Sequence, residues 1–104
     1  MSFFSRLFSS APAVDYAELL KRGAIIVDVR TPGEFAQGHI KGSLNIPLDS
    51  IRSKVSEFKT KNKPVITCCR SGARSGSAKS ILTDAGVECY NGGAWNDLNS
   101  KIAG

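Results

Sequence analysis

The chain has 104 residues, a length that supports one domain and leaves no room for a second. Its 41% apolar and 22% charged residues are ordinary for a globular protein, which excludes a disordered chain and a coiled coil. Fourteen basic residues against nine acidic ones give a net charge of +5, which favours an anionic partner. Three cysteines, with Cys68 and Cys69 adjacent, form a poor disulfide framework and fit a reducing compartment, so we expect a cytoplasmic protein.

Residues 1–9 are expected to form an amino-terminal arm ahead of a domain over residues 10–104. The first 14 residues hold one arginine, no acidic residue and four serines, with apolar side chains at helical spacing. Their apolar runs are too short for a secretory signal or a membrane span. We expect the arm to pack on the domain or on a neighbouring subunit, and the composition leaves a mitochondrial transit peptide open as the alternative.

The rest of the chain alternates between helical and extended patterns. In chain order, capping residues, glycine stops and apolar spacing predict a helix from Asp15 to just before Gly23, a strand over 24–29, a helical turn from Thr31, a short strand over 44–46, a helix from Asp49 or Ser50 to Phe58, a strand over 64–68, a helix from Gly72 or Ala73 to Ala85, a strand over 87–90 and a helix from Trp95 to Lys101. Strands separated by helices need crossover connections, which produce a mostly parallel sheet with helices on both faces. The sequence therefore predicts a single α/β domain.

The positive charge is concentrated in one stretch of the chain. In residues 50–80 a single acidic residue, Glu57, stands against eight basic ones: Arg52, Lys54, Lys59, Lys61, Lys63, Arg70, Arg74 and Lys79. This surplus surrounds Cys69 in the sequence, although a solvated helix and loop is the expected role of the three lysines at positions 59–63. No aromatic residues are interleaved with the surplus and no nucleic-acid-binding motif is present, so nucleic acid is not an expected partner.

Residues 65–76 carry the candidate chemistry. A buried strand ends in a cysteine, Cys69, a glycine-containing loop follows, and a helix begins. Ligands bind at the carboxyl ends of strands in open α/β sheets, where loop N–H groups and a helix N-terminus can hold an anion. Arg70 and Arg74 flank the same place. We therefore expect the Cys69 thiol to have a lowered pKa and to act as a nucleophile toward an anionic substrate.

This pattern alone leaves two chemistries open, because a cysteine in an anion cradle can take up either phosphate or sulfane sulfur. Four residues separate Cys69 from Arg74. Cysteine phosphatases that cradle phosphate have a loop one residue longer. The shorter loop closes more tightly around the sulfur, which disfavours a phosphatase or an arsenate reductase.

Three segments are specific in combination: Asp28-Val29-Arg30 with Glu34-Phe35 and residues 38–47; the loop Cys69-Arg70-Ser71-Gly72-Ala73-Arg74-Ser75; and Asn91-Gly92-Gly93 before Trp95. Together they resemble the rhodanese-like family, specifically its small single-domain sulfurtransferases. The resemblance implies a central, mostly parallel sheet of about five strands with helices on both faces. It also implies catalysis by Cys69, a donor site formed by Arg70, Ser71, Gly72, Ala73 and Arg74, and no metal or organic cofactor.

The function implied by the resemblance is sulfur transfer. The Cys69 thiolate would take sulfane sulfur from thiosulfate or a persulfide and pass it to cyanide or a thiol acceptor. Efficient thiosulfate users in the family commonly carry a second cation just after the first arginine, where this chain has Ser71, so a persulfide donor is an alternative to thiosulfate. A second hypothesis is a persulfide carrier that hands sulfur to a protein partner in a relay.

The other two cysteines are expected to be structural. Strand alternation should point Cys68 away from Cys69 and into the core, and Cys89 lies in a predicted buried strand. A vicinal disulfide or a resolving role for Cys68 is the less favoured interpretation.

The remaining polar residues of these segments are expected to support the fold. His39 lies in a bend that ties loops together, and a preformed thiolate needs little general base catalysis. Asp28, Arg30 and Glu34 should form an ionic network near the end of the sheet. The glycines at 92 and 93 should let the backbone pass close to the loop, and Trp95 either lines the pocket or packs in the core.

Overall fold

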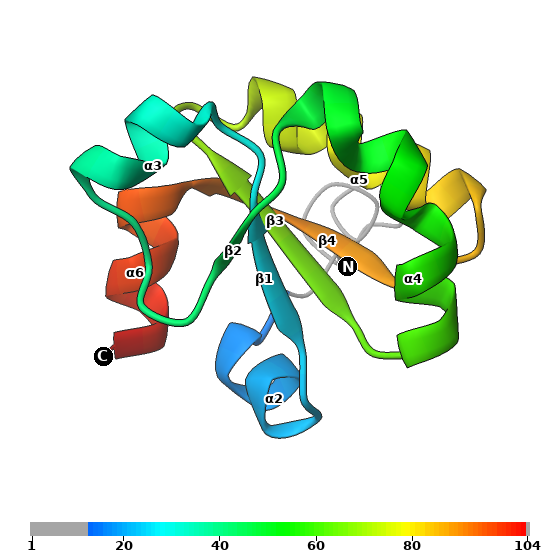
Figure 1. The fold of residues 1–104 in the computed structure, drawn as a ribbon. Coiled ribbons are helices and arrows are strands. Elements are labelled where there is room, and N and C mark those ends of the chain that lie inside the picture. The colour runs from blue at the N-terminus through cyan, green and yellow to red at the C-terminus, as the bar shows by residue number, and fades with distance from the viewer. Residues whose placement is uncertain (1–12, 104) are drawn as a thin grey trace, which may run out of the picture.

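Within residues 13–103, which the computed structural model describes, four parallel strands form the centre of the fold (Figure 1). The strands are β1 (Ile25–Asp28), β2 (Leu44–Asn45), β3 (Val65–Cys69) and β4 (Cys89–Ala94), in the order β2-β1-β3-β4 across the sheet. The helices are α2 (Tyr16–Lys21), α3 (Pro32–Gln37), the 3-10 helix η1 (Leu48–Lys54), α4 (Val55–Lys61), α5 (Ala73–Asp84) and α6 (Trp95–Ala103). The expected arm over residues 1–9 lies outside the described residues.

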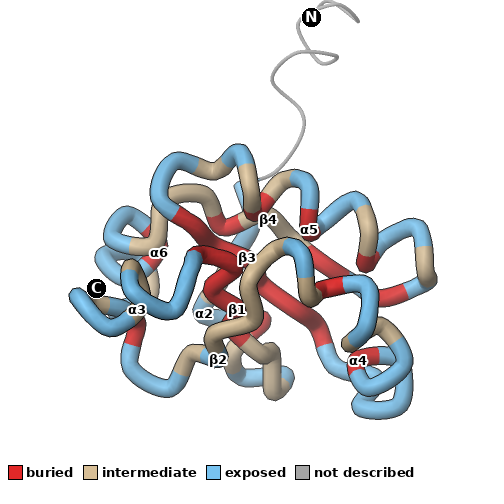
Figure 2. The backbone as a smooth tube through the Cα atoms, turned by 45° about the horizontal axis from the view of Figure 1, so that its top comes forward, coloured by how far each residue is buried: buried red, intermediate tan, exposed pale blue. Residues whose placement is uncertain are grey.

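Helices cover both faces of the sheet (Figure 1). On the face of α2 and α6, the buried core consists of Leu19, Ile26, Ile40, Ile66, Cys68 and Leu98. On the face of η1, α4 and α5, it consists of Val27, Val29, Ile51, Phe58, Val65, Cys69, Ala78, Leu82, Val87 and Cys89. Figure 2 shows how this places β3 at the buried centre, and every residue of that strand is buried. The predicted α/β class is confirmed, with four strands in the described residues instead of about five.

Local sequence explains where two helices begin. The carboxylate of Asp15 accepts a hydrogen bond from the Glu18 N–H at 3.0 Å, which caps α2 as predicted. Thr31 caps α3, and Thr31 and Glu34 form a reciprocal capping box with Pro32 in the first turn. The capping box holds the Glu34 carboxylate at the amino-terminal end of α3.

The predicted helix from Asp49 or Ser50 to Phe58 is wrong in form. Its first part is the 3-10 helix η1, which begins after Pro47 without a side-chain cap, and its second part is α4. The hydroxyl of Ser53 donates to the Ser50 carbonyl at 2.7 Å, and such local bonds compete with α-helical ones. Ile51 remains fully buried, because an inward residue every three or four positions fits either helix type.

The strand predicted over 87–90 is found, but it starts and ends later in the chain than predicted. β4 runs over Cys89–Ala94 and therefore includes both glycines that were expected to follow the strand. The predicted strand ends too early because glycine has a low strand propensity. At Gly92 a side chain would have no room: a Cβ there would lie 2.9 Å from the Thr67 carbonyl oxygen and 2.8 Å from Leu98 Cδ2.

None of the helices within residues 13–103 combines the length and the apolar character needed to cross a membrane.

Candidate active site

Cys69 is the last residue of β3, at the carboxyl end of the central strand. Its side chain is fully buried under the loop that leads to α5. The backbone N–H of Gly72 donates to Sγ at 3.0 Å and that of Ser75 at 3.4 Å, while the Ser75 hydroxyl lies 3.3 Å away. The chain thus turns its own hydrogen-bond donors onto one sulfur atom.

Gly72 makes this turn possible. Its φ of 104° is a left-handed conformation that favours glycine, and it is the residue that precedes the first turn of α5. A Cβ at this position would also lie 3.5 Å from the Cα of Gly93 in β4. The expectation that the glycine pair after Asn91 lies close to the loop is therefore confirmed for Gly93, whereas Gly92 lies against β3 and Leu98.

The surroundings act on the Cys69 thiol in opposite directions. Burial raises its pKa, but hydrogen bonds from the Ser75 hydroxyl and from the backbone N–H groups of Ser75, Gly72 and Ser71 lower it more. The net pKa of Cys69 lies below its ordinary value of 9.0. The thiolate is thereby favoured at this position, as the sequence predicts.

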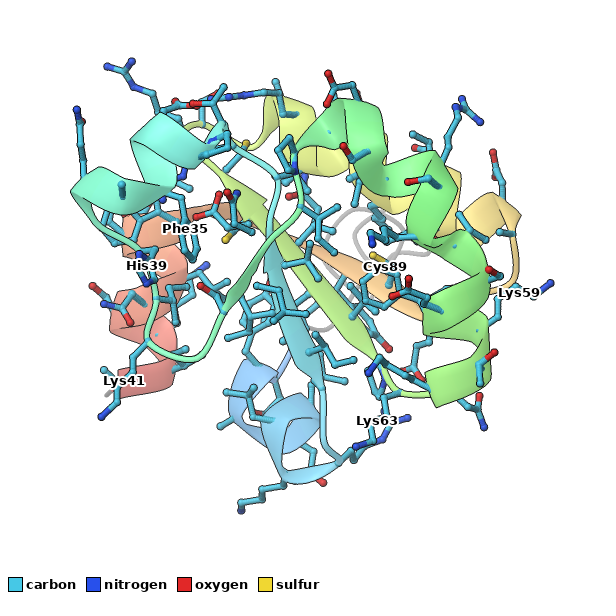
Figure 3. All side chains as sticks on the ribbon, viewed as in Figure 1. Phe35, His39, Lys41, Lys59, Lys63 and Cys89 are labelled. Atoms are coloured by element: carbon cyan, nitrogen blue, oxygen red, sulfur yellow. The ribbon has the colours of Figure 1, made fainter. Side chains whose placement is uncertain are left out.

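The other two cysteines have the opposite property. Burial raises the pKa of Cys68 to about 12 and that of Cys89 to about 11. Cys68 packs on the α2 and α6 face of the sheet, whereas Cys69 packs on the opposite face, so the predicted alternation is confirmed. Figure 3 shows Cys89 between the sheet and the α4 and α5 layer.

The two arginines of the loop have different surroundings. The Arg74 guanidinium binds the Glu34 carboxylate through two hydrogen bonds, of 2.7 and 3.0 Å. Arg70 is exposed, and it forms no hydrogen bond or ion pair within residues 13–103. Arg74 therefore braces the loop against α3, and Arg70 is the cation available to an incoming anion.

A buried ion pair lies beside the site, at the end of β1. Asp28 and Arg30 are joined by a contact of 2.6 Å between Oδ2 and Nη2, and both side chains are almost fully buried. Arg30 also donates to the carbonyls of Glu34 and Gly38, which fixes both ends of α3. The predicted ionic network is confirmed for Asp28 and Arg30 but not for the Glu34 carboxylate, which pairs with Arg74 while only the Glu34 backbone carbonyl contacts Arg30.

Sequence reasoning gave no role to Ser75, which contacts the Cys69 sulfur, or to Asn91, which contacts Ser75. Ser75 is fully buried, and its hydroxyl donates to Oδ1 of Asn91 at 2.7 Å. Its place in the first turn of α5 is a usable signal, because N–H groups of a first turn point toward the preceding loop. Asn91 carries no local signal, since 16 positions separate it from Ser75 and only the pairing of β3 with β4 brings them together.

Comparison with known proteins assigns the family. A model described as the rhodanese-like domain matches residues 12–97. The chain belongs to the rhodanese-like domain family. Thiosulfate sulfurtransferase PspE of Escherichia coli is 35% identical over 74 residues, which cover 69% of this chain and 71% of that protein. The uncharacterized protein YqhL of Bacillus subtilis is 44% identical over 71 residues, and the match spans 67% of this chain but only 56% of YqhL.

Solved structures agree with this assignment. A structure described as a rhodanese with anions from E. coli is 34% identical, with a TM-score of 0.65 over 71% of this chain and 89% of that one. The reduced CoADR-RHD of Bacillus anthracis is 33% identical, with a TM-score of 0.68, and its match covers 82% of this chain but 15% of that protein. The rhodanese-like fold of this chain is therefore similar both to small proteins and to part of a larger one.

An open depression of about 340 Å³ lies beside the Cys69 loop of this rhodanese-like domain. It is lined by Arg30, Glu34, Gln37, Gly38, Arg70 and Trp95. The guanidinium of Arg30 lies 4.9 Å from the ring centroid of Trp95, within cation–π range. Both roles expected for Trp95 are found: it lines the depression, and it packs, partly buried, against the core on the α2 and α6 face.

The histidine of this rhodanese-like domain is part of the scaffold, as predicted. Nδ1 of His39 lies 2.7 Å from the carbonyl oxygen of Phe35, and the two rings stack with centroids 3.7 Å apart. Figure 3 shows the two residues together at the end of α3. The contact closes the turn after that helix.

The lysines at positions 59–63 of the basic surplus lie away from Cys69 in space. Lys59 and Lys63 lie by the end of α4 and the start of β3, as Figure 3 shows. Cys69 occupies the other end of that strand. A strand is extended, so the residues before its start and the residue at its end lie at opposite ends of the sheet although they are close in sequence. All three lysines at positions 59–63 are exposed, which agrees with the solvated helix and loop expected for them.

Proposed function

We propose that this chain is a sulfurtransferase in which Cys69 carries sulfane sulfur as a persulfide. One observation supports this most strongly: the Cys69 sulfur is buried at the focus of two backbone N–H groups and a hydroxyl, beside an exposed arginine. Such an arrangement stabilises negative charge on sulfur without a metal. Relatives that bear the name thiosulfate sulfurtransferase add to this support.

The loading step begins with the Cys69 thiolate, after its proton has passed to solvent. The thiolate attacks the outer sulfur of thiosulfate, a sulfur–sulfur bond forms to Sγ, and the electron pair of the broken bond leaves with sulfite. The N–H groups of residues 70–74 then stabilise the negative outer sulfur of the persulfide. Arg70 attracts and orients the anionic oxygens of the donor, because it is the loop cation that Glu34 does not hold.

The unloading step returns the enzyme to its first state. Cyanide or a thiolate attacks the outer sulfur, the new bond forms to the acceptor, and the electron pair of the sulfur–sulfur bond returns to Sγ of Cys69. The products are thiocyanate or an acceptor persulfide and the free thiolate. A persulfide of a protein or of a small thiol can replace thiosulfate as the donor, since only the outer sulfur is attacked.

Intact-mass measurement after incubation with thiosulfate tests the proposal. We expect the mass to rise by one sulfur atom, to return to its original value when cyanide is added, and to stay unchanged in Cys69→Ser. Cys68→Ala and Cys89→Ala are the matched controls, and both should still take up sulfur. Loading followed by slow release to cyanide would favour the carrier role over free turnover. Hydrolysis of an aryl phosphate without sulfur uptake would overturn the proposal.

A further inference from the structure

The side-chain amide of Asn91 makes three hydrogen bonds, two of which connect β4 to the Cys69 loop and the first turn of α5. Its Oδ1 accepts from the Ser75 hydroxyl at 2.7 Å and from the Gly93 N–H at 2.9 Å, and its Nδ2 donates to the Gly72 carbonyl at 3.1 Å. Gly72 and Ser75 are the residues whose N–H groups contact Sγ of Cys69. Asn91 therefore touches the sulfur's hydrogen-bond donors without touching the sulfur.

The Ser75 hydroxyl has one proton and two acceptors within reach. Among residues 13–103 its Oγ contacts only Cys69 Sγ, at 3.3 Å, and Asn91 Oδ1, at 2.7 Å. When Cys69 is a thiol, its S–H can donate to Ser75 while Ser75 donates to Asn91, so every group is satisfied. When Cys69 is a thiolate, the hydroxyl can stabilise the sulfur only by turning away from Asn91.

We propose that Asn91 is a positioning residue that competes with the Cys69 thiolate for the hydroxyl proton of Ser75. This inference deepens the proposed sulfur transfer. Its consequence, that Asn91 favours the persulfide state, rests on that proposed function. In the free thiolate the charge is on Sγ, and Ser75 donates to it. Once the outer sulfur has bound, the charge lies on that atom and Sγ is a poor acceptor, so the hydroxyl returns to Asn91. Asn91 thus favours the loaded state over the free thiolate.

Geometry makes Asn91 suited to this role. Ser75 is fully buried, so solvent does not supply an alternative partner for its hydroxyl. Asn91 Oδ1 keeps the Gly93 N–H when the hydroxyl turns away, which limits the cost of releasing it. The charged or titratable groups that act on Cys69 are Arg74 from α5 and Cys68 from β3. Glu34 and Asp28 act on Arg74 in turn, and Asp28 and Arg30 act on Cys68. None of them hydrogen-bonds to Ser75.

The experiment titrates the Cys69 thiolate by its ultraviolet absorbance in the full chain. Cys68 and Cys89 have pKa values of about 12 and about 11, so the first step belongs to Cys69. Asn91→Ala should lower the pKa of Cys69 by about one pH unit, the equivalent of one neutral hydrogen bond, because Ser75 is free to donate to the sulfur. The Gly72 carbonyl still accepts from the Gly76 N–H at 3.0 Å in this variant, so the loop keeps an anchor.

A double-mutant cycle separates the relay from a merely structural role. In a Ser75→Ala background, Asn91→Ala should leave the pKa of Cys69 unchanged, because no hydroxyl remains to be released. A pKa that stays the same or rises in Asn91→Ala alone, or an equal drop in both backgrounds, would overturn the inference. Asn91→Asp, which keeps the shape of the side chain, serves if the alanine variant does not fold. Asn91→Asp should raise the pKa of Cys69, because a carboxylate holds the Ser75 hydroxyl more strongly and repels the thiolate. An unchanged pKa of Cys69 in this variant would contradict the inference.

The titration does not depend on whether the protein transfers sulfur. Failure of sulfur uptake with the expected pKa changes would overturn the proposed function and leave the role of Asn91 intact. Sulfur uptake with no effect of Asn91 on the pKa would do the reverse. The unfolding temperature of each variant shows whether a shift comes from a loosened fold.

Discussion

The guanidinium of Arg74 and the carboxylate of Glu34 form a two-point ion pair across 40 positions of the sequence. The pair joins the first turn of α5, which carries the Cys69 loop, to the amino-terminal end of α3. The capping box with Thr31 fixes Glu34 in turn, so the loop is braced against a rigid helix start. Arg74 thereby serves the site by holding the loop in shape.

Because of this ion pair, the free energy of unfolding should depend on pH in the acidic range. The side-chain hydrogen bond from Arg74, followed by the Thr31 N–H, lowers the pKa of Glu34 from 4.5 to about 2. Because the folded pKa is depressed, Glu34 stabilises the fold fully above pH 4.5 and loses this contribution as the pH falls through about 2. Urea unfolding should show that Glu34→Gln is less stable than the parent at pH 7. The difference in the free energy of unfolding between the two proteins should become smaller between pH 4.5 and pH 2. A difference that stays constant with pH would contradict a stabilising role of the ionised Glu34 carboxylate.

The buried pair of Asp28 and Arg30 should be far more sensitive than a surface pair. Asp28→Asn keeps the side-chain volume but leaves the Arg30 guanidinium buried without its counter-charge, which costs about 3–5 kcal/mol. Denaturant titration measures this loss in the free energy of unfolding. Glu88→Gln is the matched control, because its pair with Arg22 is exposed and exposed pairs contribute little. Equal losses in the two variants would show that burial does not govern the Asp28 pair.

Gly92 should tolerate no side chain. A Cβ there would meet the Thr67 carbonyl oxygen, which is fixed in β3, and Leu98 at less than 3 Å. Gly92→Ala should therefore lower the free energy of unfolding by about 1–3 kcal/mol. Gly33→Ala is the control, because Gly33 lies in α3 with no atom within 4 Å of its Cβ position, and alanine is the better helix former. The expected order of thermal stability is Gly33→Ala at or above the parent and Gly92→Ala below it.

The sequence was sufficient for the features that depend on near neighbours. The buried strand before Cys69, the loop, and the caps at Asp15 and Thr31 all follow from residues a few positions apart. β4 was misplaced because its glycines are unfavourable for a strand in isolation and are required only by contact with β3. The 3-10 form of η1 was missed because its apolar spacing fits an α-helix equally well.

Features that depend on distant neighbours could not be predicted from the pattern. The sequence places Lys63 six positions before Cys69, but only the fold shows that β3 separates the two residues, with Lys63 before its start and Cys69 at its end. The Asn91 contact with Ser75 requires knowing which strands pair and in which register. The partner of Arg74 was likewise hidden, because Glu34 lies on another helix and was expected to join Asp28 and Arg30.

The three thiols should titrate separately. Hydrogen bonds lower the pKa of Cys69 against the effect of burial, whereas burial alone dominates at Cys89 and Cys68 and raises their pKa values to about 11 and about 12. Ser75→Ala removes the largest of the contributions that lower the pKa of Cys69, so this pKa should rise while the other two remain in place. Thiolate absorbance against pH checks the order. A first step assigned to Cys68 or Cys89 by single alanine variants would refute it.

Arg70 should control the affinity for an anionic donor, and the basic surplus at the opposite pole should not. A hydrogen bond between charged groups contributes about 1.5–3 kcal/mol, so Arg70→Gln should raise the KM for thiosulfate by roughly 10-fold or more. Lys59, Lys61 and Lys63 precede β3, and the four residue steps of that strand alone put its start roughly 13 Å from Cys69. This separation exceeds the Debye length of about 8 Å at physiological ionic strength. Replacing all three lysines by glutamine removes more positive charge than Arg70→Gln does, yet it should change KM less than about twofold. Steady-state kinetics at fixed ionic strength compare the two variants. If the lysine variant lost as much affinity as the arginine variant, recognition would depend on the net charge of the protein and not on a cation at the loop.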